Sequence, residues 1–282
     1  MIEENILKIN NIIKQSAAKS GRNPEDITLL AASKTRTPDE IIKAYKCGIT
    51  VFGENYVQEF LGKYEYFNNR NFGVKIEGCS FPNLTWHLIG KLQKNKVKYI
   101  AKKVSLIHSV DNFELAKLID KFWSGNKNHL IFNEKNIINA YDNSDNCDAN
   151  NKNNNNINNI ENNIHNTAQI LIEINIAEES TKSGIDIENA KKLISDLNCL
   201  KNTALKGFMT MPPYSANPED NRIYFRALKD FLDYTNKNNL YKNQLTELSM
   251  GTSGDFSAAI EEGATIIRLG TVIFGERIYA YK

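Results

Sequence analysis

A lysine stands where a short apolar run gives way to a helix-start signal near the beginning of the chain. Lys34 follows the run Leu29–Ala32, and the next residues include Thr37 and Glu40 at the spacing of a capping box. Partial removal from water favours a neutral amine, which is a nucleophile for a carbonyl carbon. The alternative is an ordinary solvated lysine in a connecting loop, because most lysines lie at the surface. Lys34 is therefore a candidate for imine chemistry, but its position in the sequence does not by itself distinguish this role from that of a solvated lysine.

Two loops near the other end of the sequence are rich in glycine, serine and threonine. The first begins at Ser249 and reads SMGTSGD, and the second contains Gly270 and Thr271. Glycine lets backbone N–H groups approach an anion, and hydroxyl groups add further donors. In β/α barrels phosphate is often bound by the loops after the last two strands. The pair of loops therefore indicates a phosphate site.

Arg268 lies inside the last apolar run, Ile266–Leu269. Strand alternation should direct its guanidinium into the fold, where a charged group needs a partner. Because arginine only donates hydrogen bonds, it can bind an unprotonated ring nitrogen. The equally weighted alternative is a buried ion pair with Asp255 or Glu54.

Three further polar residues follow or occupy apolar runs. Asn55 could donate a hydrogen bond to a ligand oxygen, although by itself an asparagine there is more typical of a turn. His87 and His108 are interpreted as hydrogen-bonded core or rim residues, because too few acidic or cysteine side chains cluster near them for a metal site. The basic run between Lys91 and Lys103 is interpreted as a solvated helix face and not as a nucleic-acid site.

Short apolar runs alternate with amphipathic ones over most of the chain, which predicts parallel strands joined by helices. The predicted strands are Thr28–Ser33, Thr50–Gly53, Thr85–Ile89, Leu106–Val110, Gln169–Asn175, Ala204–Met209, Glu247–Met250 and Thr265–Leu269. The predicted helices include Pro38–Lys46, Asn112–Phe122, Ile187–Leu197, Pro218–Asn236 and Phe256–Glu262, after an N-terminal helix that ends near Gly21. The expected fold is a single-domain α/β (β/α)8 barrel over residues 1–282, and a doubly wound open sheet is the alternative.

Two segments interrupt this pattern. Asn133–Asn166 is dominated by asparagine and has no apolar period, so we expect a disordered insertion. A smaller insertion is expected around Arg70–Pro82. Without the longer one about 250 residues remain, which is a typical length for a β/α barrel.

Composition narrows the class of protein. The 282 residues include 35 basic and 33 acidic side chains, a balance that argues against nucleic-acid or membrane-surface binding. No apolar run is long enough to span a bilayer, and the N-terminus resembles neither a secretory signal nor a transit peptide. The four cysteines lie far apart without a C-x-x-C pair, which favours free thiols and a cytoplasmic location.

Taken together, the motifs resemble those of the pyridoxal-phosphate homeostasis proteins, also called proline synthetase co-transcribed homologues. The matching stretches occur in family order over nearly the whole chain outside the insertions: LLAASKT (29–35), FGENYVQE (52–59), WHLIGKLQKNK (86–96), ILIEINIAEESTKSGI (170–185), KGFMTM (206–211) and LSMGTSGDFSAAIEEGATIIRLGTVIFGER (248–277). The Asn-rich insertion departs from the family pattern.

The resemblance implies a barrel of the alanine-racemase N-terminal-domain type that binds pyridoxal 5'-phosphate (PLP). Lys34 matches the family lysine that forms a Schiff base with PLP, Asn55 an asparagine beside the ring, and Arg268 the arginine that faces the pyridine nitrogen. The phosphate-side matches are Ser249, Met250 and Gly251 in the first loop and Gly270 and Thr271 in the second.

The same resemblance implies a non-catalytic, monomeric carrier that stores, buffers or delivers PLP, with PLP-dependent apoenzymes as candidate partners. The alternative is an amino-acid racemase or decarboxylase of the same fold type. Such enzymes need a second, mostly β domain, and the sequence stops 14 residues after Arg268, so we expect no such domain. A third hypothesis is an interaction scaffold without any ligand.

Overall fold

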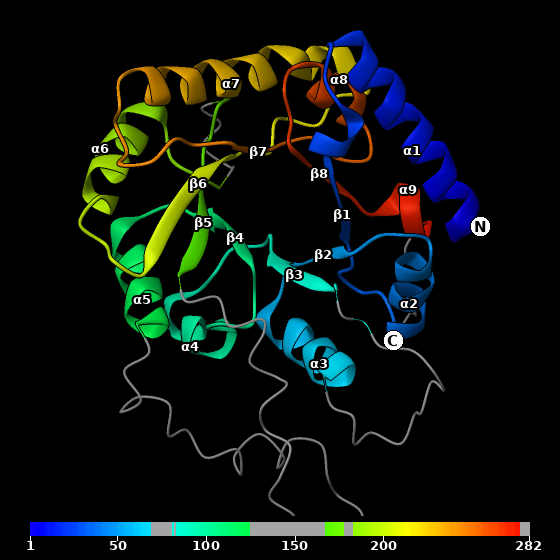
Figure 1. Ribbon diagram of the computed structural model, residues 1–282, viewed down its shortest axis with the longest axis horizontal. Coiled ribbons are helices and arrows are strands. Elements are labelled where there is room, and N and C mark those ends of the chain that lie inside the picture. Colours follow the sequence, from blue (N-terminus) through cyan, green and yellow to red (C-terminus); the bar gives the residue numbers. More distant parts are fainter. Residues whose placement is uncertain (69–80, 82, 125–166, 178–182, 277–282) are drawn as a thin grey trace, which may run out of the picture.

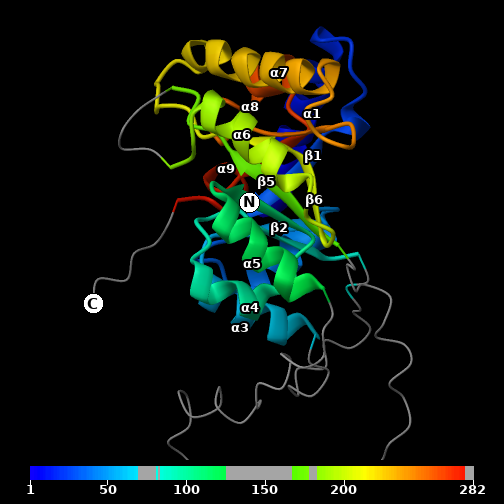
Figure 2. The ribbon, with the colours of Figure 1, turned by 90° about the vertical axis from the view of Figure 1, so that its left-hand side faces the viewer.

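Eight parallel strands form a closed barrel in which each strand pairs with its sequence neighbours and β8 closes on β1. The computed structural model describes residues 1–68, 81, 83–124, 167–177 and 183–276. Figure 1 shows the strands as an inner ring with the helices outside it, and the side view in Figure 2 shows α5 and α6 packed along the outer wall. The closed strand order confirms the predicted (β/α)8 barrel and excludes the open sheet.

The elements alternate as the sequence predicts. The strands are β1 Thr28–Ala32, β2 Val51–Glu54, β3 Thr85–Leu88, β4 Leu106–Val110, β5 Ala168–Glu173, β6 Thr203–Met209, β7 Glu247–Ser249 and β8 Ile266–Leu269. The α-helices are α1 Ile2–Lys19, α2 Pro38–Lys46, α3 Val57–Asn68, α4 Val97–Ile100, α5 Phe113–Trp123, α6 Ile187–Leu197, α7 Arg222–Lys237, α8 Phe256–Glu261 and α9 Thr271–Phe274. Short 3-10 turns are η1 Pro24–Asp26, η2 Lys94–Lys96 and η7 Pro218–Asn221.

All eight predicted strands are present, and no end differs from its predicted position by more than two residues. The predicted capping box at the start of α2 is also present, because Thr37 accepts from the Glu40 N–H while Glu40 accepts from the Thr37 N–H. No helix was predicted over Val57–Asn68, where α3 lies. The predicted insertion Asn133–Asn166 lies outside the described residues, as does the smaller one apart from Phe81.

The barrel interior contains two layers of side chains. The lower layer is apolar and is formed by strand residues alone: Leu30, Leu106, Leu171, Met209 and Ile266. Side chains two positions apart on a strand lie on the same face. The residues two positions after Leu106, Leu171 and Ile266 are therefore also interior, and they are polar: His108, Glu173 and Arg268. This second layer forms the floor of the mouth at the carboxyl ends of the strands.

Helix α1 holds the last helices of the barrel in place. Its buried face includes Ile6, Ile9 and Ile13, and it packs against α2, α8 and α9, as Figure 1 also shows. The Asn5 side chain donates to the Ile273 carbonyl of α9 at 3.1 Å. Helices α8 and α9 directly follow the two glycine-containing loops, so α1 supports both loops from outside. Among the described residues, no helix is both long and apolar enough to cross a membrane.

Candidate functional site

Strand pairing brings Lys34 and Arg268 to the same side of the mouth. Leu30 of β1 is in register with Arg268 of β8, and a side chain placed on Gly270 would contact Ala32. Lys34 follows Ala32 by two residues and is half-buried. Two residues separated by most of the sequence are thus carried by β8 and by the loop after β1, the two strands that close the barrel.

Helix α3 fixes the backbone on both sides of Lys34. The buried Lys63 ammonium donates to the Ser33 carbonyl at 2.7 Å. Glu59 accepts a hydrogen bond from the Thr35 N–H, and Thr35 has a positive φ of 64°. Non-glycine residues adopt this backbone region only where the surroundings compensate the strain. The α3 side chains therefore determine where Lys34 leaves the strand.

Lys63 also forms an ion pair with a buried carboxylate, that of Glu54. Lys63 Nζ lies 2.7 Å from both Glu54 Oε1 and Glu59 Oε1, and Glu54 is fully buried at the end of β2. Burial raises the pKa of Glu54, and the ammonium of Lys63 and the hydroxyl of Ser33 partly offset that rise. We call Lys63, Glu54 and Glu59 the α3 clasp.

The two glycine-containing loops contact each other. The Arg268 N–H donates to the Gly251 carbonyl at 3.0 Å, and the Gly270 N–H is 3.4 Å from Ser253 Oγ. Gly251 has φ +91°, and a Cβ there would lie 2.6 Å from the Ala259 Cβ of α8, so only glycine fits. The Gly270 carbonyl accepts from the third and fourth residues of α9, Ile273 and Phe274. The N–H groups of Thr271 and its successor have no acceptor within that helix and are left for another partner.

Arg268 is a buried cation without an ion pair among the described residues. Nη1 donates to Ser249 Oγ at 2.6 Å, and Nη2 donates to the Thr210 carbonyl at 2.9 Å and to the Met211 sulfur at 2.8 Å. Burial lowers its pKa to about 10, with Asp255 and Glu173 acting in the opposite direction, so it stays charged at neutral pH. Three of its five N–H groups have acceptors in the described part of the chain, and two do not.

Neither carboxylate proposed as its alternative partner pairs with Arg268. Glu54 is bound to Lys63 and Ser33. Asp255 accepts from the Asn221 side chain and from the Thr252 N–H instead. The ion-pair alternative from the sequence is therefore wrong for both residues.

Ser249 and Met250 face opposite sides of the barrel wall. Ser249 is fully buried, and its hydroxyl bonds to Arg268 and to His108 Nδ1, at 2.9 Å from the latter. Met250 packs in the core between strands and helices, and its N–H donates to the Ile266 carbonyl. The expectation that both belong to a phosphate loop stays a prediction. Their contacts place Ser249 beside Arg268 and give Met250 a packing role.

Asn55 presents a polar atom without a partner. Its Oδ1 is buried and accepts no hydrogen bond from any residue that the structure describes. The Asn55 backbone is held against Gly90, where any Cβ would overlap the Asn55 carbonyl oxygen. Because buried polar atoms are nearly always bonded, this oxygen is a candidate acceptor for a ligand.

Glu173 adds a second titratable group to the floor. It ends β5 and is only 7% exposed. Burial, together with Asp111, raises its pKa to about 7, and Arg268 and Lys91 counteract that rise. Glu173 is therefore partly protonated at neutral pH.

The sequence pattern contained signals for residues that were not singled out. Glu173 stands two positions after Leu171, so reading every strand end at a period of two would have found it. Glu59 and Lys63 stand four residues apart, the spacing of a helical ion pair, but α3 itself was not predicted.

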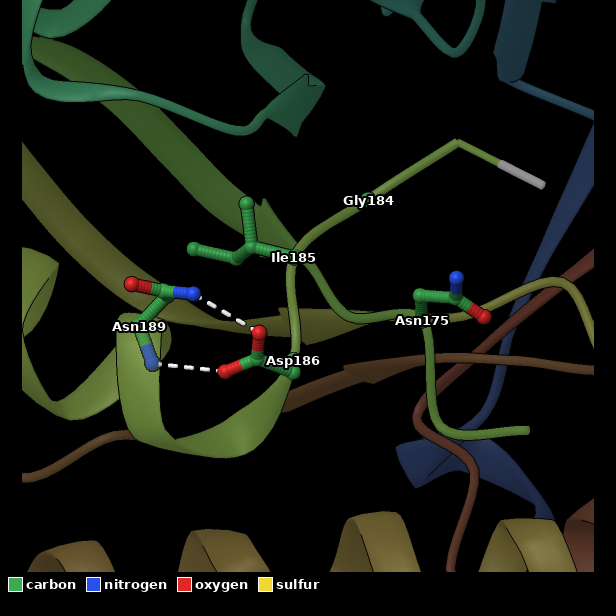
Figure 3. Close-up of a pocket in the computed structure, with 5 residues that line it drawn as sticks. All are labelled: Asn175, Gly184, Ile185, Asp186 and Asn189. Carbon is green, nitrogen blue, oxygen red and sulfur yellow. Dashed lines mark hydrogen bonds between the residues drawn. The ribbon is translucent and has the colours of Figure 1, made fainter. Parts of the chain in front are cut away.

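A separate polar depression lies where β5 leads into α6. Figure 3 shows its lining residues: Asn175, Gly184, Ile185, Asp186 and Asn189. Asp186 caps α6 by accepting from the Asn189 N–H at 2.8 Å and from its side chain at 2.7 Å. This geometry is explained by helix capping, and none of the eight predicted site residues lines it. In the described residues no group of His, Cys, Asp and Glu side chains could hold a metal ion.

Comparison with known proteins gives the family. Residues 149–278 match the family described as "Alanine racemase, N-terminal domain". The pyridoxal phosphate homeostasis protein of Aquifex aeolicus is 39% identical over 276 residues, which is 98% of each chain. The chain belongs to the pyridoxal phosphate homeostasis protein family. This result confirms the resemblance and the alanine-racemase type of barrel expected from the sequence.

Two solved structures extend the comparison. PipY of Synechococcus elongatus, solved with PLP bound, is 25% identical, with a TM-score of 0.68 over 98% of this chain and 100% of that one. Alanine racemase of Corynebacterium glutamicum is 12% identical, with a TM-score of 0.58 over 100% of this chain and 63% of that one. The racemase therefore shares the fold alone.

Proposed function

We propose that this protein binds PLP as a Schiff base on Lys34 and serves as a carrier in PLP homeostasis without catalytic turnover. The observation that carries the proposal is Arg268, a buried charge that has no ion pair within the described ranges. It lies beside the strand that leads to Lys34. When bound, PLP would supply an aldehyde for an amine and a phosphate for a donor-rich loop. The curated relatives share the homeostasis name over nearly the whole chain.

The residues at the mouth fit this cofactor. The unused N–H groups of Arg268 suit a ring nitrogen that carries a lone pair. The Asn55 Oδ1, which has no partner among the described residues, suits a ring substituent that donates a hydrogen bond. The Gly251 and Gly270 loops suit the phosphate. Lys34 would provide the amine, which the α3 clasp positions.

The same arginine would disfavour reactions that need the ring as a strong electron sink, although it still permits racemisation. A donor-only guanidinium leaves a pyridine nitrogen unprotonated, and this weakens the ring as an electron sink. A racemase or decarboxylase activity is the alternative. All eight predicted site residues belong to one barrel, so we also propose that a single chain carries a complete site.

Borohydride reduction followed by peptide mapping tests the proposal. Purified protein with added PLP should gain a visible absorbance band, and reduction should add the cofactor mass to Lys34. Lys34→Ala should lose the band and keep its cooperative unfolding, while Lys117→Ala, at an exposed lysine, should retain both. An adduct on another lysine would refute the assignment, and steady conversion of an amino acid that requires Lys34 would refute the carrier role.

A further inference from the structure

A hydrogen-bonded chain crosses the floor of the mouth from β8 to β3. Arg268 Nη1 lies 2.6 Å from Ser249 Oγ, which lies 2.9 Å from His108 Nδ1. His108 Nε2 in turn lies 3.0 Å from His87 Nδ1. Ser249 and His108 are fully buried, so water does not complete their hydrogen bonding.

The direction of each hydrogen bond follows from the arginine. Arg268 can only donate, so Ser249 Oγ accepts from it. In the described part of the molecule the buried Ser249 hydroxyl proton then has one remaining partner, His108 Nδ1, which must be an acceptor. A neutral histidine that accepts at Nδ1 carries its proton on Nε2, which can donate to His87 Nδ1. The opposite direction would leave the serine proton buried without an acceptor, which costs free energy.

The charge state of His108 agrees with this direction. Burial, His87 and Arg268 together lower its pKa well below the usual value, so the ring is neutral at pH 7. A protonated His108 would lose its acceptor at Nδ1 and would add a second positive charge near Arg268.

We propose that His108 is a positioning residue that acts through Ser249 to fix the guanidinium of Arg268 at the floor of the cofactor mouth. This inference deepens the proposed function and rests on it for the identity of the ligand. The proton positions themselves are a property of the protein without ligand. The guanidinium only donates hydrogen bonds, so a ligand that meets it must present an acceptor, and His108 and Ser249 would fix where that acceptor has to lie.

Nitrogen-15 NMR of the ligand-free protein tests the proton positions. Long-range correlations at pH 7 should show His108 as a neutral ring with its proton on Nε2. Ser249→Ala should shift the Nδ1 resonance of His108, while Ser16→Ala, a buried serine on α1, should leave it unchanged. A His108 proton on Nδ1, a charged ring, or an unchanged resonance in Ser249→Ala would overturn the proposal.

Two substitutions of His108 separate positioning from general packing. The asparagine Oδ1 lies near the position of histidine Nδ1 and can accept from Ser249, whereas the glutamine amide lies near Nε2 and reaches towards His87. His108→Asn should therefore retain PLP affinity within about threefold, and His108→Gln should lose on the order of tenfold, as should Ser249→Ala. Equilibrium dialysis with PLP measures this, and equal affinities for the two variants would overturn the proposal.

The dialysis and NMR measurements test the proposed function and the role of His108 independently. If the wild-type protein does not retain PLP in dialysis, the proposed function fails, and the NMR result still decides the direction of the hydrogen-bonded chain. If PLP is retained and the tautomer is the opposite one, the positioning role of His108 fails alone.

Discussion

At the level of single residues, Arg268 combines a structural cost with its proposed binding role. A buried charge without a carboxylate is unfavourable, and proteins retain such groups where function requires them. Its three hydrogen bonds go to a hydroxyl, a carbonyl and a thioether, none of which is charged. Stability and ligand affinity should therefore respond differently to its removal.

Substitution of Arg268 by methionine tests this separation. The ligand-free variant should unfold with a free energy within about 1 kcal/mol of the wild type, because the lost hydrogen bonds are offset by removal of a buried charge. PLP affinity should fall at least about tenfold, since a charged donor to the ring is lost. Urea unfolding and equilibrium dialysis measure the two quantities. A loss of several kcal/mol with unchanged affinity would assign Arg268 a structural role instead.

Glu173 makes the stability of the protein depend on pH. Its pKa is raised from 4.5 to about 7, so the folded protein holds this proton more tightly than the unfolded chain. This contribution is fully present below pH 4.5 and is lost as the pH rises towards 7, to an extent of about 3 kcal/mol. Glu173→Gln should therefore show a smaller fall in unfolding free energy between about pH 5 and pH 8 than the wild type. Identical pH profiles for the two proteins would contradict this prediction.

At the level of elements, α3 connects the barrel wall to the loop that carries Lys34. Lys63→Met should leave Glu54 buried without its cation, so the unfolding free energy should fall by about 3 kcal/mol. The matched control is Lys117→Met, which removes an exposed pair with Glu114 and should cost less than about 1 kcal/mol. Urea denaturation compares them. A similar small loss for both variants would show that the α3 clasp adds little to stability.

Local pattern was sufficient to predict the eight strands and several helices, but not α3, because strand runs and helix caps depend on residues that are close together in the sequence. The Thr37–Glu40 capping box and the eight strands are examples. The hydrogen-bond and ion-pair partners of the buried polar side chains were not predictable in the same way. Whether Arg268 pairs with Glu54 depends on where α3 places Lys63, and only the folded barrel determines that. The hydroxyl of Ser249, expected near a phosphate, is bonded to Arg268 and His108 for the same reason.

At the level of the whole molecule, the candidate site joins the first strand to the last two. Binding of PLP should therefore protect both ends of the barrel from hydrogen exchange at the same time. We expect slower exchange in peptides covering residues 28–36, 249–256 and 266–274, and no change in a peptide covering α5. Mass spectrometry of exchange with and without PLP measures this, with Lys34→Ala as the control. Protection confined to one end of the barrel would contradict a shared site.

The closure of β8 on β1 also affects synthesis of the protein. Residue 34 leaves the ribosome long before residue 268, and until the later segment emerges the lysine has neither the arginine nor the glycine loops beside it. A nascent chain can thus form most of its strands and still be unable to bind PLP. Only a completely synthesised and folded protein would accordingly bind PLP, and partly synthesised chains would not lower the concentration of free PLP in the cell.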